Sequence, residues 1–509
     1  MNSRKTGPTI TALLASSLAI FMGAALLAAP AAVADTDPES PIPDTSDSLS
    51  VPELLESAYA LNGPTVSEAS PAPYGTDFPV VMEANFARPH YDVGTANADF
   101  ALLDDLERLI RGSYLTPTGQ LKPKAQRSAT VVNVSVSRME KSVRVGREMI
   151  KAAQNGVTVR FIHGKATQSA ESRSLAKKLA AQKTGHVVIC SKGKSLACMS
   201  SLNGAIAHAK IVMVSDTYTR DGDRARGAVW TGSSNYGGRS GEYTYNNGIT
   251  VYNDKKMWVQ MSRLWNDMWA RRNINNDYLS YVSARSSSYG YAGATSAGYS
   301  SNFATRGMFY SNLSNYTIYA TPIKATPTNG RDPVLNMLNR VVPDNQCRIR
   351  LMENRFKYRR IAVAYKLVEL SKGGCRISAV GFKDDNKKNY QEHCQIVIRI
   401  CRPILDVFKT SVTEIDTAYA HPHDKTILVD AKLKPNKLNP EERTPEGHMW
   451  PQSGHRATLV LAGSAALTGS NLVMSDEVTT ETTDPEIYDQ YLNHWKAITT
   501  TRPYGIFRY

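Results

Sequence analysis

Two short segments of the chain place a histidine two residues before a lysine, each at the start of an apolar run. His208 and Lys210 stand in HAKIVMV, and His423 and Lys425 stand in HDKTILV. In a β-strand, residues i and i+2 point to the same side, so each histidine projects beside its lysine. An imidazole can attack an electrophile or exchange a proton near neutral pH, and an ammonium group stabilises negative charge that develops on oxygen. One such pair is most simply an exposed strand end, but two pairs at matching places indicate a reactive site.

The segments around the two pairs repeat each other in order and type. Each half has a helical pattern, an apolar strand, a second amphipathic helix that ends at glycine, and another strand. Each half then reaches its His-x-Lys segment, a Gly-Ser-Asn cluster and a closing helix that contains tryptophan. In the first half these elements are 101–111, 129–137, 143–155, 157–162 and 257–271; in the second they are 333–341, 348–352, 359–371, 376–380 and 487–498.

This repetition predicts the fold class and the domain boundaries. Strands that alternate with helices of about a dozen residues are typical of α/β proteins. We therefore expect two similar α-β-α lobes with mixed, largely parallel sheets, related by a pseudo-twofold axis, with the active site at the lobe interface. The lobes should span residues 76–280 and 315–509, joined by a Ser-, Tyr- and Gly-rich loop at 281–314.

The N-terminal region has the composition of a leader followed by a linker. Two basic residues precede an apolar run that ends in Ala32-Val33-Ala34, which predicts a secretory signal peptide over 1–34 and a secreted protein cleaved near Ala34. An uncleaved membrane anchor is the alternative. Residues 35–75, rich in Pro, Ser and Glu, are expected to be a flexible linker.

Export also decides how the cysteines and the charge are interpreted. Six cysteines in an exported chain favour three disulfides, among which Cys190–Cys198 would close a small loop. Zinc is less favoured, because no Cys-x-x-Cys spacing occurs. The net charge of +14 favours anionic partners, either phospholipid headgroups or nucleic acid.

With these motifs, the sequence resembles the phospholipase D superfamily, which is marked by His-x-Lys, four residues, Asp, and then Gly-Ser-x-Asn. The second copy matches the first part in full, with Asp430 as the acid, whereas the first copy has Ser215 at that place and Asp216 one residue later. The following cluster is regular in the first copy, Gly232-Ser233-Ser234-Asn235. We align it with a compressed Gly469-Ser470-Asn471 in the second copy.

The resemblance implies a two-step displacement at a phosphodiester, through a phosphohistidine and without a metal or other cofactor. It implies that His208 is the nucleophile, that His423 is the acid, and that Lys210 and Lys425 bracket the phosphate oxygens. Further phosphate-binding or orienting residues would be Ser233, Asn235, Ser470, Asn471 and Asp476, with Asp430 among the catalytic residues. An acid after the Gly-Ser-x-Asn strand should orient each histidine: Asp476 or Glu477 in the second half, and an amide of Asn246 or Asn247, or Glu242, in the first.

The function that follows is a secreted, monomeric phosphoric diester hydrolase of phospholipase D type. It would hydrolyse phospholipid headgroups at a membrane surface or transfer the phosphatidyl group to another alcohol. Two alternatives stay open: an extracellular, metal-independent nuclease of the same superfamily, and a catalytically weakened lipid-binding relative. The second alternative is suggested by Ser215 and by the amides in the first half.

Overall fold

The computed structural model describes residues 76–92, 95–139, 143–165, 168–191, 193–242, 244–284, 308–311, 313–382, 414–418, 421–436 and 442–500. The expected signal peptide at 1–34, the linker at 35–75 and positions 285–307 of the connecting loop lie outside these residues. So do Cys394 and Cys401. Within the described part of the chain, no helix is both long and apolar enough to cross a membrane.

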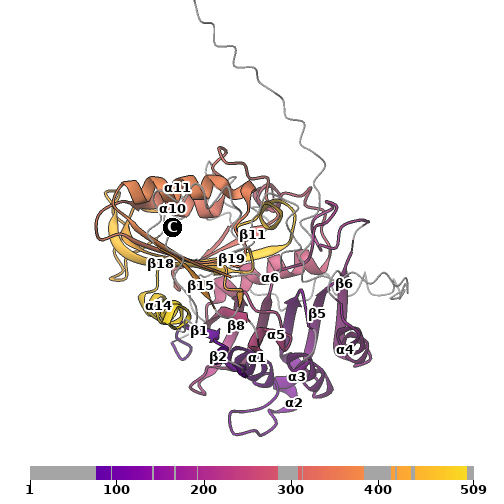
Figure 1. Ribbon diagram of the computed structural model, residues 1–509. Helices are drawn as coiled ribbons and strands as arrows, with labels where there is room; N and C mark the ends of the chain where they lie inside the picture. The colour runs from indigo at the N-terminus through magenta and orange to yellow at the C-terminus, as the bar shows by residue number, and fades with distance from the viewer. Residues whose placement is uncertain are drawn as a thin grey trace, which may run out of the picture. The chain divides into compact units, whose positions relative to one another are not determined.

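The first half forms a mixed sheet with the strand order β1-β9-β8-β7-β4-β5-β6. Helices α1, α3 and α4 pack on its outer face, while α6 and α7 follow the last strand (Figure 1). The strands are β1 (Val81–Ala87), β4 (Val131–Val136), β5 (Thr158–Gly164), β6 (Gly185–Cys190), β7 (Ile211–Tyr218), β8 (Arg224–Gly232) and β9 (Thr244–Tyr252). The helices are α1 (Ala101–Arg111), α2 (Lys124–Ala129), α3 (Arg144–Gln154), α4 (Ala170–Ala180), α5 (Arg239–Glu242), α6 (Lys255–Trp269) and α7 (Tyr278–Ser283). A short hairpin of β2 (His90–Asp92) and β3 (Thr95–Asn97) stands apart from the sheet.

The second half builds a sheet of the same plan, with the order β10-β11-β19-β18-β17-β13-β14-β15. Helices α10 and α11 cover its outer face, and α14 closes the chain beside β18 and β1 (Figure 1). The strands are β10 (Met308–Ser311), β11 (Tyr316–Thr321), β12 (Val341–Val342), β13 (Arg348–Met352), β14 (Arg376–Phe382), β15 (Glu414–Ala418), β17 (Thr426–Leu433), β18 (His455–Gly463) and β19 (Glu477–Thr482). The helical segments are α10 (Pro333–Arg340), η2 (Tyr358–Arg360), α11 (Ile361–Lys372), α13 (Gly469–Val473) and α14 (Pro485–Thr500).

The register of the strands makes the two halves equivalent residue by residue. Thr231 faces Ile211 across β7 and β8, as Ala462 faces Thr426 across β17 and β18. Inner-face residues of both sheets share one hydrophobic core with α6 and α14. The outer faces have cores of their own.

The expected fold class is confirmed in its main terms, because the chain forms two mixed α/β lobes. The expectation of largely parallel sheets is wrong for the described strands. Parallel pairing occurs where a helix can cross over, as α3 does between β4 and β5, while β7, β8 and β9 pair antiparallel. The sequence pattern shows that strands and helices alternate, but it does not show that β7, β8 and β9 follow one another as antiparallel neighbours without a crossover helix. The prediction therefore gives too large a proportion of parallel strand pairs.

Local sequence explains where the helices begin and end. Asp332 accepts hydrogen bonds from the backbone N–H groups of Val334 and Leu335 at the start of α10, with Pro333 in the first turn. Gly156 and Gly374 follow α3 and α11 with φ of 88° and 112°. Only glycine adopts this conformation without strain, so the predicted glycine stops are confirmed.

Candidate functional site

The two His-x-Lys segments lie where the halves meet. Each segment immediately precedes a central strand, β7 or β17, and runs along the first residues of a strand from the other half. The backbone N–H of His208 donates to the carbonyl of Asp476 (3.0 Å), and that of His423 donates to the carbonyl of Tyr245 (2.9 Å). In addition, β16 (His421–Pro422) pairs in parallel with β9, so a strand of the second half extends the first sheet.

His208 is oriented by a carboxylate from the opposite half. Its Nδ1 lies 2.9 Å from both carboxylate oxygens of Glu477, at the start of β19. The same carboxylate accepts hydrogen bonds from the hydroxyl of Ser464 (2.5 Å) and the amide of Asn471. Because a carboxylate only accepts, the imidazole proton lies on Nδ1, which leaves the lone pair of Nε2 for chemistry.

His423 is oriented in the same crossed manner, but by an amide. Its Nδ1 lies 2.9 Å from Oδ1 of Asn246, on β9. The amide nitrogen of Asn246 donates to the carbonyls of Ser240 and Thr244, each at 3.1 Å, and this fixes which end of the amide faces the histidine. Of the orienting groups considered in the first half, the structure selects Asn246 over Glu242.

The electrostatic surroundings favour the neutral form of His208. Burial lowers the pKa of this histidine, and the nearby ammonium groups of Lys210 and Lys425 lower it further, against the opposing effect of Glu477. Lys425 belongs to the other half, so its effect reflects the closeness of the two segments. Each lysine Nζ donates to the backbone carbonyl of its own histidine, at 2.8 Å for Lys210 and 2.9 Å for Lys425.

Glu353 is a buried acid beside the second motif that the sequence analysis did not identify. Burial raises the pKa of its carboxyl to about 8, in spite of Lys425, so the group is mostly protonated at neutral pH. Glu353, Lys425 and Arg360 line a cavity with room for about one water molecule. The strand register places Val136 at the equivalent position of the first half, so comparing the two halves of the sequence could not identify Glu353.

The serine equivalent to Ser233 is Ser464, so the alignment with Ser470 is wrong. Ser233 accepts a hydrogen bond from the N–H of Asn247 (3.0 Å), and Ser464 accepts one from the N–H of Val478 (2.9 Å). Ser470 instead lies in α13, where its hydroxyl is 3.1 Å from that of Thr468. The true counterpart of the first cluster is Gly463-Ser464-Ala465-Ala466.

The two expected asparagines have different surroundings. Asn235 is the residue for which the second half has Ala466, and its Oδ1 is buried without a hydrogen-bond partner in the described part of the chain. Asn471 reaches the site from α13 through its bond to Glu477. The alignment of Gly469-Ser470-Asn471 with the first cluster is therefore wrong, although one of its residues, Asn471, does contact the site.

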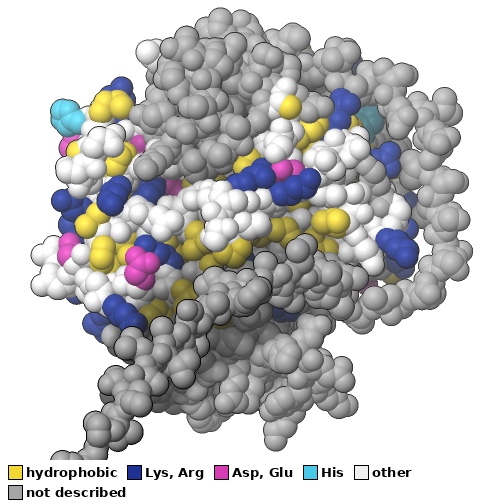
Figure 2. Space-filling model, turned by 90° about the horizontal axis from the view of Figure 1, so that it is seen from above, with side chains coloured by type: hydrophobic (Ala, Val, Ile, Leu, Met, Phe, Trp, Pro, Cys, Tyr) yellow, Lys and Arg dark blue, Asp and Glu magenta, His cyan; other side chains and the backbone are white. Residues whose placement is uncertain are grey.

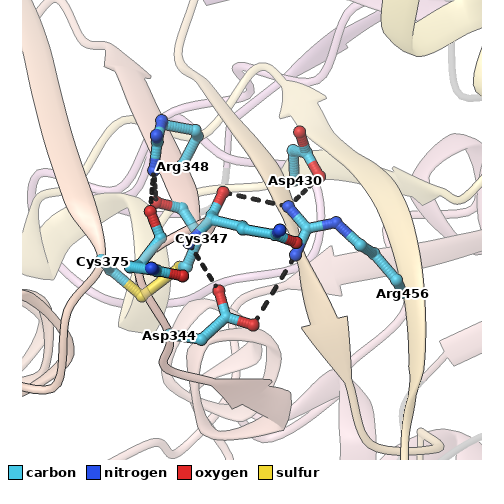
Figure 3. The surroundings of a disulfide bond; sticks show 8 residues. Asp344, Cys347, Arg348, Cys375, Asp430 and Arg456 are labelled. Carbon is cyan, nitrogen blue, oxygen red and sulfur yellow. Dashed lines mark hydrogen bonds and ion pairs between the residues drawn. A yellow bond between two sulfur atoms is a disulfide. The ribbon is translucent and has the colours of Figure 1, made fainter.

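Asp430 lies within β17, opposite Arg348 of β13 and Thr458 of β18. Its carboxylate pairs with Arg456 at 3.1 Å, in a cluster next to the Cys347–Cys375 disulfide (Figure 3). Ser215 holds the equivalent place in the first half, and its hydroxyl accepts the N–H of Val131 (2.8 Å). The acid position of the motif thus braces neighbouring strands in both halves, and the structure does not bring Asp430 to the histidines.

Asp476 is next to the orienting acid but has another contact. Its carboxylate accepts the backbone N–H groups of Cys198, which closes the disulfide loop with Cys190, and of the next residue, Met199. Burial raises the pKa of Asp476 to about 7. The expected pairing of Cys190 with Cys198 is present, but Glu477 and not Asp476 contacts the histidine.

Among the residues that the structure describes, no group of three or more His, Cys, Asp and Glu side chains is arranged to hold a metal ion.

Comparison with known proteins finds one family model that matches part of the chain. Residues 122–269 match the sequence model of a family described as cardiolipin synthase, PLD-like domain. This segment ends with α6 and contains the first motif. No curated protein matches the chain.

Similar solved structures share little sequence with the chain. Phosphatidylserine synthase from Haemophilus influenzae is 10% identical, with 83% of this chain and 88% of that chain covered and a TM-score of 0.44. Polyphosphate kinase from Porphyromonas gingivalis is 11% identical, with 81% and 49% covered and a TM-score of 0.43, so the chain spans about half its length. Nuc from Salmonella typhimurium, a phospholipase D family member, is 11% identical, with 38% and 95% covered and a TM-score of 0.25.

Proposed function

We propose that the protein is a phosphodiesterase of phospholipase D type that works through a phosphohistidine on His208. The crossed orientation of the two histidines carries this proposal: Glu477 holds His208, and Asn246 holds His423. Fixing the proton on Nδ1 makes Nε2 the reactive nitrogen of each ring. The match of residues 122–269 to a PLD-like domain supports the same reaction class.

The difference between the orienting groups suggests how the two histidines divide the work. A carboxylate stabilises the positive charge that His208 acquires when its Nε2 bonds to phosphorus. In the first step, Nε2 of His208 attacks, and the departing alcohol oxygen takes a proton from His423. In the second step, His423 accepts a proton from water or from another alcohol, whose oxygen displaces His208 from phosphorus.

The lysines and the overall charge agree with an anionic substrate. Lys210 and Lys425 supply positive charge where the nonbridging oxygens would become more negative. The net charge of the chain is +14, and Lys and Arg side chains are prominent among the described residues on the face shown in Figure 2. We propose a phospholipid at a membrane surface as the substrate, for a secreted and monomeric enzyme.

The substitution of Ser215 for aspartate does not weaken this proposal. Its position braces β7 against β4 by a bond to the backbone of Val131. A hydroxyl can make that bond as well as a carboxylate can. Reduced activity therefore need not follow from Ser215.

The direct test is headgroup release from phosphatidylcholine or phosphatidylethanolamine vesicles in EDTA. We expect the purified protein to release choline or ethanolamine, and His208→Ala and His423→Ala each to abolish the release. Ser470→Ala is the matched control, because Ser470 lies outside the site. Activity that requires a divalent metal, or that survives both histidine changes, would overturn the mechanism.

A nuclease is the second candidate, and the excess of basic residues favours it. Plasmid degradation in EDTA, with no release from vesicles and with the same dependence on His208 and His423, would assign that substrate. Tight vesicle binding without turnover of either substrate would instead identify a lipid-binding relative.

A further inference from the structure

The second His-x-Lys segment carries a buried charge that the first segment lacks. Asp424 stands between His423 and Lys425, where the first segment has Ala209, and it is fully buried. Lys425 has a φ of 50°, a left-handed conformation that a residue with a side chain adopts at a cost of about 1–2 kcal/mol. Something must stabilise this backbone, and Asp424 is the adjacent residue.

Asp424 is held at both its side chain and its backbone. Nε2 of His494 lies 2.9 Å from Oδ1 of Asp424. The amide of Asn247 donates to the same oxygen (3.0 Å) and to the carbonyl of Asp424 (2.7 Å). Asn247 is in turn fixed by the hydroxyl of Tyr491, at 3.0 Å from its Oδ1. The peptide group beside Lys425 therefore has little freedom to turn.

His494 has a fixed tautomer because of its second partner. Nε of Arg88 lies 3.0 Å from Nδ1 of His494. Arginine only donates, so Nδ1 accepts and the imidazole proton lies on Nε2, where it can be donated to Asp424. The ring is fully buried and stacks on Phe86, with 4.4 Å between the centroids.

The three members of this chain of contacts come from distant parts of the sequence. Arg88 follows β1, Asp424 lies in the second motif, and His494 lies in α14. Arg88 is half-buried, and this burial lowers the pKa of its guanidinium, although Asp99 and Asp424 oppose the effect. Such burial costs free energy, and the cost is offset only by well-made hydrogen bonds.

We propose that His494 is a positioning residue for the second motif. Arg88 sets the tautomer of His494, and His494 anchors the carboxylate of Asp424. Asp424, held in this way, keeps the backbone at Lys425 in its left-handed conformation. His423 and Lys425 are the neighbours of Asp424 in the chain, so the placement of their side chains depends on residues that touch no substrate. This inference rests on the proposed function for its kinetic consequence, but its structural part stands by itself.

A pair of substitutions at His494 separates positioning from packing. His494→Phe keeps a stacked ring but loses both hydrogen bonds, whereas His494→Gln can accept from Arg88 and donate to Asp424. We expect His494→Phe to lower kcat by about 10- to 100-fold with little change in KM, and His494→Gln to retain activity within about threefold. His163→Phe, which changes another buried histidine outside the site, is the matched control and should keep kcat.

A second measurement needs no substrate. In the NMR spectrum of histidine-labelled protein, His494 should show the tautomer with the proton on Nε2. The His423 signals should shift in His494→Phe but not in His494→Gln or His163→Phe. Arg88→Met provides the test if His494→Phe does not fold, and it should shift the His423 signals in the same direction.

The outcomes of the two measurements are distinguishable. If the wild-type protein turns over no phosphodiester, the proposed function fails, and the His423 signals still decide the positioning role. Equal activity of His494→Phe and His494→Gln, unshifted His423 signals, or the opposite tautomer would each overturn the inference.

Discussion

The two halves of the molecule have the same strand order and register but different polar groups around their histidines. Glu477 accepts from His208, Ser464 and Asn471, so its surroundings consist of donors. Asn246 occupies the equivalent place and donates to the carbonyls of Ser240 and Thr244. Each position is therefore built for the group that it holds. A duplicated scaffold has kept its geometry while its two reactive segments have become chemically distinct.

The same divergence extends to neighbouring positions. Asp424 and Glu353 in the second half replace Ala209 and Val136 in the first, so these two buried acids have no counterpart beside the first motif. With two identical motifs, only the orientation of a bound substrate would distinguish the two histidines. The different surroundings distinguish His208 from His423 before any substrate binds, which agrees with the proposed division into nucleophile and acid.

The largest expected effect concerns this division. With a labelled diester and an acid quench, we expect phosphate to be trapped on His208 in the wild-type protein and in His423→Ala. His208→Ala should carry no label, and each variant should lose at least about 10⁴-fold in kcat. Label on His423 in the His208→Ala protein would reverse the assignment of the halves.

The next effect tests whether the two orienting groups are interchangeable. Glu477→Gln should lower kcat by about 10²- to 10⁴-fold, because the stabilising charge beside His208 is lost. Asn246→Asp should mainly destabilise the fold, by about 1–3 kcal/mol, since its new oxygen would face two carbonyls. Steady-state kinetics and urea unfolding measure the two effects. Equal kinetic losses in both variants would contradict the distinction.

The disulfides offer a smaller contrast. Cys190–Cys198 has a sequence separation of 8, and the backbone N–H of Cys198 donates to Asp476, next to Glu477. Cys347–Cys375 has a separation of 28 and lies by Asp430. Loop entropy predicts losses of about 2.5 and about 3.6 kcal/mol when the bridges are removed by Cys→Ser pairs. We expect kcat to fall several-fold only for the Cys190→Ser, Cys198→Ser protein, in assays at a temperature where both variants are folded. A larger kinetic loss from the other pair would show that the Asp476 contact does not matter.

The smallest effect is on acid stability. Burial lowers the pKa of His163 to about 4, and neither ring nitrogen has a hydrogen-bond partner in the described part of the chain. The pKa of a histidine in an unfolded chain is about 6.5. Between the two pKa values the unfolded chain binds a proton that the folded chain does not, so the free energy of unfolding falls as the pH is lowered. The register places Gly381 at this position in the second half.

His163→Leu should therefore reduce the loss of unfolding free energy between pH 7 and pH 5 by about 2 kcal/mol relative to the wild-type protein. Urea unfolding at both pH values measures this difference. His448→Leu, at an exposed position, is the control. An unchanged pH dependence in His163→Leu would show that the ring can be protonated without leaving the core.

The sequence predicted the lobes because periodicity and helix stops are local properties. The repeated order of strands, helices and glycines was enough to identify two equivalent halves, and the motif histidines followed from their spacing. Contacts between the halves could not be predicted from the sequence, because the partners of His208 and His423 lie 269 and 177 residues away along the chain. Nothing in the sequence near His494 indicates that it meets Arg88 and Asp424.

Similarity of short patterns also misled in one place. Gly469-Ser470-Asn471 resembles the first cluster more closely than Gly463-Ser464-Ala465-Ala466 does, yet the register of β17 and β18 selects the latter. Asp430 matches its motif in the sequence but pairs with Arg456. Strand pairing, which decides both cases, depends on the whole sheet and is not encoded in a few adjacent residues.

The insertion of β16 beside β9 has a consequence for the synthesis of the protein. Residues 421–422 pair with the first residues of β9, an interior strand of a sheet whose other strands are all complete once Tyr252 has been made. His208 obtains its carboxylate only when residue 477 has been made. A ribosome-bound fragment that lacks the last strand would contain His208 without Glu477. The contact that orients His208 would then form only near the end of translation, and a product truncated before residue 477 would lack it.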